Sequence, residues 1–290
     1  MSIETGGHWL RGGFVAAAGI LACASLVRAQ MPGSGPGGSG GVTNQTMMGT
    51  GGGLGDSLSY GTVGHQQERE QVSAFQAFSK ESDAAKKIQK GRDFLRKYPK
   101  SPFEEQVDAA LTDAYRTQAD WKNEYSYGEQ ALALNPNDVD VLAMVSWTIP
   151  HVFDPKSPDA NDQLDKAEKY SKHALDVLST IQKPHDMNDA GFAAAKAHRT
   201  AQSHSALGLV YFRRNDYENS EKELAQATKD NPTPDQTDLY VVGIDRVHLS
   251  RFGEAADAFH ACAAMAGTFQ DPCKKNAAAA DAQAGNAKAQ

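Results

Sequence analysis

The side chains of this chain that could perform chemistry include nine histidines and three cysteines, and their spacing argues against a catalytic centre. His204 and Ser205 are adjacent, and neighbours on a helix point about 100° apart, which excludes a nucleophile–base pair. No phosphate-binding, nucleophile-elbow or zinc-protease motif occurs. Two pairs could contribute to a metal site or be solvated loop residues: His151 with Asp154, and His185 with Asp186. The sequence therefore predicts no catalytic residue, no metal and no cofactor, and hence a protein that is not an enzyme.

The cysteines are best understood together with the amino-terminal segment. Arg11 precedes an apolar stretch from Phe14 to Val27, and Val27-Arg28-Ala29 fits a small-residue cleavage site. We therefore expect residues 1–29 to be a signal peptide and the mature protein to be exported, either periplasmic or secreted. An alternative is the segment ending at Cys23, which loosely resembles a lipoprotein cleavage box, so that a lipid on Cys23 would tether the protein to a membrane.

Cleavage after Ala29 would leave Cys262 and Cys273. An even pair of cysteines in an oxidising compartment indicates a disulfide, although two unrelated thiols are the alternative. The net charge of −7 comes without any long basic run, so we expect no nucleic-acid binding. Residues 30–65 are rich in glycine and poor in apolar side chains, which predicts a disordered linker.

From Gln66 onward the spacing of apolar residues becomes helical. The clearest unit spans residues 201–233. Leu207, Gly208 and Tyr211 share one face of a first helix, Asn215-Asp216 makes a turn, and Leu224 and Ala227 lie on the inner face of a second helix that Pro232 ends.

This spacing of Leu-Gly-x-x-Tyr, Ala and Pro resembles the tetratricopeptide repeat of about 34 residues. The same register fits residues 105–138 and 236–268 and, less closely, residues 66–99 and the two helices at 139–148 and 162–178. In the unit 105–138, Glu124 replaces the usual small residue. The resemblance implies an all-α, superhelical solenoid of about five helical hairpins over residues 66–268.

Two segments interrupt the predicted array, namely the proline-rich insert 149–160 and the connection 179–188. Either these segments shape a binding site, or they are longer loops that the array tolerates without a functional role. After the second, residues 189–214 could form one long helix capped by Asn188 or Asp189. We expect residues 269–290 to be a carboxy-terminal capping helix and tail, with the helix at Lys274–Ala284 stapled to the last hairpin by the Cys262–Cys273 bridge.

In this family the first helices of successive hairpins line a concave groove that binds a peptide or a partner's helix. Transferring the usual groove positions gives the candidate partner-binding residues Asp113, Arg116, Trp147, Leu209, Phe212, Arg213, Tyr240 and His248. Core packing is the alternative for Trp147, Phe212 and Tyr240. The resemblance thus implies a non-enzymatic scaffold that binds an unidentified protein or peptide, and the predicted signal peptide places this scaffold in the bacterial cell envelope.

A second expectation comes from Phe94-Leu-Arg-Lys-Tyr-Pro-Lys-Ser-Pro-Phe103. This segment is similar to one in outer-membrane barrel-assembly lipoproteins and in periplasmic division-coordination proteins. The resemblance leaves open a membrane-tethered lipoprotein of either type. An enzyme or a carbohydrate-binding accessory would need a cluster of converging titratable groups, which the sequence does not offer.

Overall fold

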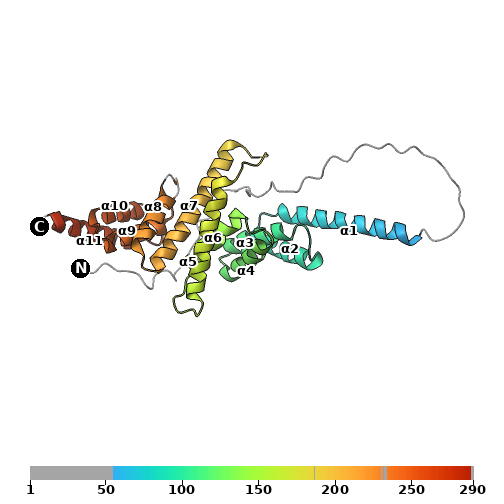
Figure 1. Ribbon diagram of the computed structural model, residues 1–290, viewed down its shortest axis with the longest axis horizontal. Helices are drawn as coiled ribbons and strands as arrows, with labels where there is room; N and C mark the ends of the chain where they lie inside the picture. The colour runs from blue at the N-terminus through green and yellow to red at the C-terminus, as the bar shows by residue number, and fades with distance from the viewer. Residues whose placement is uncertain (1–54, 186, 230, 232–233, 289–290) are drawn as a thin grey trace.

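The computed structural model describes residues 55–185, 187–229, 231 and 234–288, and within these it describes side chains from Gln66 to Asn286. Every regular element in this part of the chain is a helix, which confirms the predicted all-α class (Figure 1). The helices are α1 Gly55–Ser79, α2 Ala84–Lys97, α3 Glu104–Thr117, α4 Trp121–Leu134, α5 Val139–His151, α6 Ala160–Thr180, α7 Asp189–Arg213, α8 Tyr217–Thr228, α9 Gln236–His248, α10 Phe252–Ala263 and α11 Gln270–Lys288.

The helices pair in chain order into five antiparallel hairpins, from α1–α2 to α9–α10, and each hairpin lies beside the next (Figure 1). Helix α1 projects from one end of the row, and α11 covers α10 at the other end. The predicted linker 30–65 is wrong at its carboxy-terminal end, because α1 already begins at Gly55. Glycines become sparser after Gly55, which removes the entropic obstacle to a helix. The predicted signal peptide and Cys23 lie outside the described residues.

One turn recurs in three of the hairpins. Ala119, Asn215 and Ser250 each have a left-handed backbone conformation, with φ of 54°, 61° and 60°. In each turn the following residue donates its N–H to the carbonyl five residues back, and the left-handed residue donates to the carbonyl three residues back. This pair of bonds satisfies the last carbonyls of the first helix and reverses the chain. The recurrence of the turn is direct structural evidence of a repeat.

Glycines allow the two helices of a hairpin to approach closely. A Cβ atom on Gly208 of α7 would lie 2.4 Å from Leu224 Cγ of α8, and one on Gly243 of α9 would lie 2.4 Å from Phe259 Cε1 of α10. Both pairs are sixteen residues apart, so the same contact is made in successive hairpins. Leu224 and Phe259 are fully buried, and they fill the space that each glycine leaves.

The interruptions are shorter in the structure than the sequence suggests. Helix α5 continues through Pro150 to His151, so the predicted insert 149–160 begins inside a helix. The proline lies in the last turn, and Ile149, Pro150 and His151 are all buried, so packing outweighs the lost hydrogen bond. After the second interruption, α7 runs without a break from Asp189, and the Asn188 side chain caps it by accepting from the Gly191 N–H.

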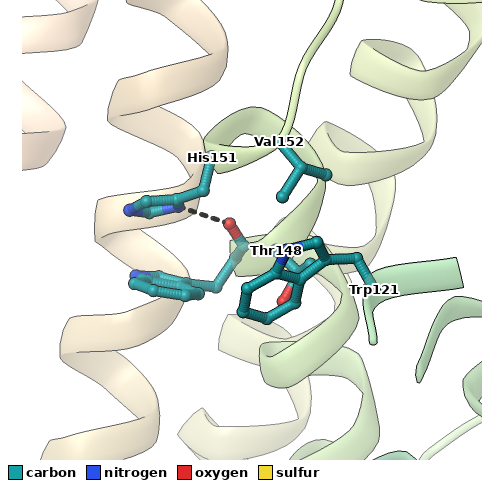
Figure 2. A pocket seen from close by; sticks show the side chains of 5 residues that line it. Trp121, Thr148, His151 and Val152 are labelled. Carbon is teal, nitrogen blue, oxygen red and sulfur yellow. Dashed lines mark hydrogen bonds between the residues drawn. The ribbon is translucent and has the colours of Figure 1, made fainter. Parts of the chain in front are cut away.

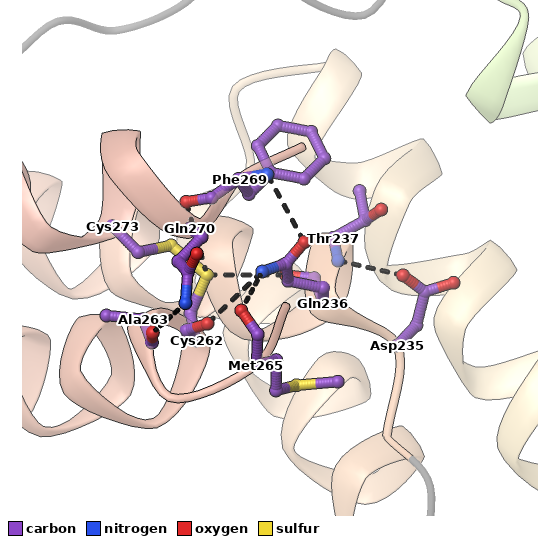
Figure 3. The surroundings of a disulfide bond; sticks show 9 residues. All are labelled: Asp235, Gln236, Thr237, Cys262, Ala263, Met265, Phe269, Gln270 and Cys273. Atoms are coloured by element: carbon purple, nitrogen blue, oxygen red, sulfur yellow. Dashed lines mark hydrogen bonds between the residues drawn. A yellow bond between two sulfur atoms is a disulfide. The ribbon is translucent and has the colours of Figure 1, made fainter. Parts of the chain in front are cut away.

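The carboxy-terminal helix α11 is tied to the last hairpin in two ways (Figure 3). Cys262 of α10 and Cys273 of α11 form a disulfide with a Cα–Cα distance of 5.9 Å. The Gln236 amide of α9 donates to the carbonyls of Cys262 and Met265, at 3.2 and 3.0 Å, and accepts from the Phe269 N–H at 3.2 Å. These bonds fix the loop between α10 and α11 against α9.

Candidate functional site

Three side chains form a stacked column on the first helices of the second and third hairpins. The Arg116 guanidinium, at the end of α3, lies 4.5 Å from the centroid of the Trp147 ring on α5. The His151 ring, one turn further along α5, stacks on Trp147 with centroids 3.6 Å apart, and its Nδ1 lies 2.7 Å from the Trp147 carbonyl oxygen. The spacing of four residues between Trp147 and His151 places both rings on one face of α5.

An apolar slot opens beside this column (Figure 2). It is lined by Trp121, Trp147, Thr148, His151 and Val152, and it has a volume of about 20 Å³. That volume holds roughly one water molecule, so the slot suits the tip of an apolar side chain better than a free metabolite. Val152 is 45% exposed and is one of the few large apolar side chains on the described surface.

Arg213, at the end of α7, contacts the last turn of α5 from the side of the fourth hairpin. Its Nε and one terminal nitrogen donate to the Pro150 carbonyl oxygen at 3.2 and 2.9 Å, and its guanidinium lies 5.6 Å from the Phe153 ring centroid. This carbonyl lies in the last turn of α5, where a cation interacts favourably with the helix dipole. Burial lowers the pKa of Arg213 to about 10. Arg213 therefore links the fourth hairpin to the third.

A buried carboxyl group lies beneath the slot. Glu124 of α4 is 0% exposed, and its Oε1 accepts from the Thr148 hydroxyl at 2.7 Å. Burial raises the pKa of Glu124 to about 7. Burial also lowers the pKa of Arg116 and lowers that of His151 to about 4, which keeps the imidazole neutral at physiological pH. Arg116 forms no ion pair among the described residues, whereas Arg199 of α7 pairs with Asp140 of α5 at 2.6 Å.

The structure brings together only part of the predicted groove. Trp147 lines the slot, Arg116 lies over the Trp147 ring, and Arg213 binds the neighbouring Pro150 carbonyl, while Asp113 is exposed one turn before Arg116. The assignment of Leu209 to a binding surface is wrong, because Leu209 is 2% exposed and belongs to the carboxy-terminal core.

The assignment of Tyr240 to a binding surface is also wrong, because Tyr240 is 8% exposed and its ring stacks on Phe269 with centroids 4.8 Å apart. Phe269 comes from the loop before α11, so this cover could not be read from the repeat pattern. Phe212 and His248 both contact Tyr217, Phe212 at an edge and His248 by stacking at 3.9 Å. His248 is itself exposed and Phe212 packs against the same core, so neither residue contributes to the slot.

Sequence reasoning did not assign five residues to the site: Trp121, Glu124, Thr148, His151 and Val152. Trp121 follows Asp120, whose side chain caps α4, so its place at a helix start could be read from the sequence. Pro150 favours a loop for His151 and Val152, whereas in the structure α5 continues to His151 and Val152 is its C-cap. Glu124 stands out in the sequence only as a departure from the small residue that the resemblance implies.

The described residues contain no group of three histidine, cysteine or acidic side chains placed to hold a metal ion. Among the helices described, none is long and apolar enough to cross a membrane.

No protein-family model matches the chain, and no curated protein matches it. Among solved structures, the chain is similar to a thermophilic tetratricopeptide repeat protein of Thermus thermophilus at 15% sequence identity. The match covers 73% of this chain and 95% of the other, with a TM-score of 0.45. The arrangement that the resemblance implied, helical hairpins stacked side by side, is present in the described part of this chain.

Proposed function

We propose that this chain is a non-enzymatic scaffold that binds a segment of a partner protein at the Trp147 slot. The observation that carries the proposal is the convergence of Arg116, Trp147 and Arg213. They come from the first helices of three successive hairpins: Trp147 lines the apolar slot together with the exposed Val152, and Arg116 lies over the Trp147 ring. Arg213 binds the Pro150 carbonyl in the same turn of α5 as His151. Tryptophan and arginine at the centre of a contact surface commonly supply most of its binding energy.

The partner in this proposal inserts an apolar side chain beside Trp121 and Trp147. The small slot makes the contact an anchor point, and the surrounding helices supply the remaining area. An extended segment lying over the column would meet donors on Arg116 and acceptors on Asp113, so its backbone groups would find partners of both kinds.

Photo-cross-linking tests the position of the contact. A photoreactive amino acid at Val152 should capture a partner in intact cells, whereas the same residue at Leu134 should not. Leu134 is the matched control because it is also a large exposed apolar side chain, 53% exposed, at the far end of α4 from the slot. Equal capture from both positions would contradict the proposal.

With the captured partner purified, Trp147→Ala should weaken binding by about thirtyfold or more, as truncation of a central aromatic anchor does. Tyr217→Ala is the control, since Tyr217 is an aromatic residue stacked on His248 away from the slot. Circular dichroism should show that both variants keep their helix content. Unchanged affinity for Trp147→Ala would remove the slot from the contact.

We propose further that the scaffold acts in the bacterial cell envelope. The apolar segment from Phe14 to Val27 and the disulfide between Cys262 and Cys273 support export to an oxidising compartment. Mass spectrometry of the natural protein distinguishes the two forms. A mature chain beginning at Gln30 supports the free protein, and a lipid on Cys23 supports the membrane-tethered alternative. An unprocessed chain with free thiols would contradict both.

A further inference from the structure

Buried acid–hydroxyl bridges cross the seams between successive hairpins. The Thr148 hydroxyl of α5 donates to Glu124 of α4, which joins the second and third hairpins. In the seam between the fourth and fifth hairpins, the hydroxyls of Ser205 and Ser220 donate to Asp238 and Asp245 of α9. All three bonds are 2.7 Å long, and all three acidic side chains are almost wholly buried.

The surroundings of Glu124 suit a neutral carboxylic acid. Its second oxygen, Oε2, is buried and has no hydrogen-bond partner in the described structure. The charged groups that face it both come from α3, namely Arg116 and Asp113, and from α5 it meets the Thr148 hydroxyl. Arg116 makes no ion pair with it, because that guanidinium stacks on Trp147. A carboxylate at this place would be a buried charge with one oxygen unsatisfied, which is costly.

We propose that Glu124 makes the seam between α4 and α5 pH-sensitive: the neutral acid leaves the seam dry beside the Trp147 slot, and release of its proton to solvent draws water to Oε2 and loosens the seam. Thr148 carries the coupling, because its hydroxyl bonds to Glu124 while its side chain lines the slot. When Glu124 is charged, water must enter the seam to satisfy Oε2, and the tryptophan side chains above it become more hydrated.

The direction of the effect follows from proton linkage. The pKa of Glu124 is raised in the folded state to about 7 from its ordinary value of 4.5, chiefly by burial. The folded state therefore binds the proton more tightly than the unfolded state. The stability that comes from keeping the buried Glu124 neutral is complete below about pH 4.5 and is lost as the pH rises through about 7.

Tryptophan fluorescence tests the proposal directly and needs no binding partner. In a Trp9→Phe background the emission comes from Trp121 and Trp147, both of which line the slot. Between about pH 5.5 and 8.5 we expect a red shift of the emission with a midpoint near 7. Glu124→Gln should abolish it, since the amide keeps an acceptor for Thr148 but does not titrate. His151 does not interfere, because its pKa of about 4 lies below this range.

Two variants should move the midpoint in opposite directions. Thr148→Val removes a hydrogen bond that favours the carboxylate, so the midpoint should rise. Asp113→Asn removes a negative charge that disfavours it, so the midpoint should fall. Asp245→Asn, in the other seam, is the matched control and should leave the transition in place.

Hydrogen exchange of amides in α5 supplies a second measurement. Exchange should accelerate above about pH 7 beyond the intrinsic rate in the parent protein and not in Glu124→Gln. An emission that stays constant over the whole pH range in the parent protein would overturn the proposal. So would a transition that survives Glu124→Gln, or one that Asp245→Asn also removes.

Discussion

The close approach at Gly243 predicts that Gly243→Ala destabilises the protein, although alanine has the higher helix propensity. Replacing glycine by alanine inside a helix ordinarily stabilises it by up to about 1 kcal/mol. In Gly243→Ala, however, the new Cβ would lie 2.4, 2.6 and 2.7 Å from three ring atoms of Phe259. Non-bonded carbons prefer separations of about 3.5–4.0 Å, so the ring or α10 must move by roughly 1 Å.

Phe259 is fully buried and contacts Tyr240, with ring centroids 6.0 Å apart, so the ring has little room to move. Overpacking of a core typically costs about 1–3 kcal/mol, which exceeds the gain from propensity. We expect Gly243→Ala to lower the free energy of unfolding by about 1–2 kcal/mol. In a chain of this size that corresponds to a fall in Tm of about 2–8 °C.

Gly253 of α10 is the matched control, because a Cβ at that position meets nothing within 4 Å. Gly253→Ala should be neutral or stabilising by up to about 1 kcal/mol. Circular dichroism in the helical band, followed during urea and thermal unfolding, measures both variants. Adding Phe259→Leu to Gly243→Ala should recover part of the loss, because the smaller side chain leaves room for the Cβ. A Gly243→Ala protein as stable as Gly253→Ala would refute the close-packing argument.

Two further predictions concern the joints of the array. Cys262→Ser with Cys273→Ser, or reduction of the disulfide, should lower the free energy of unfolding by about 3 kcal/mol. The separation of 11 residues closes a short loop, and urea unfolding with and without a reductant measures the change. Asn188→Ala should cost about 1 kcal/mol, because the cap on the Gly191 N–H is lost. Its effect should appear as faster amide exchange in the first turns of α7, and an unchanged exchange rate there would contradict the capping role.

The repeat architecture could be predicted because each hairpin carries its own local signals. The spacing of sixteen residues from Gly208 to Leu224, and from Gly243 to Phe259, sets the helix pair in each unit. The start of α7 could be read from Asn188, since a short polar side chain before an alanine-rich run is typical of an N-cap. Such signals depend on residues close together in sequence.

The candidate site could be predicted only in part, because its exposure depends on distant segments. Tyr240 occupies a groove position in the repeat, yet Phe269 from the loop before α11 covers it. The proline before His151 favours a loop in the sequence, whereas the buried faces of α5 keep the helix intact past Pro150. The role of Glu124 depends on Thr148 of another hairpin, and no pattern within one repeat indicates that bond.

The length of helix α7 has a consequence for how the array unfolds. Its 25 residues span about 38 Å, roughly twice the length of most other first helices. Phe192 and Val210 pack into the core around α5 and α6, whereas Leu209 belongs to the core around α9 and α10. Repeat arrays can melt unit by unit, but one continuous rod shared by two cores makes their loss a single cooperative event. We therefore expect the third, fourth and fifth hairpins to unfold together.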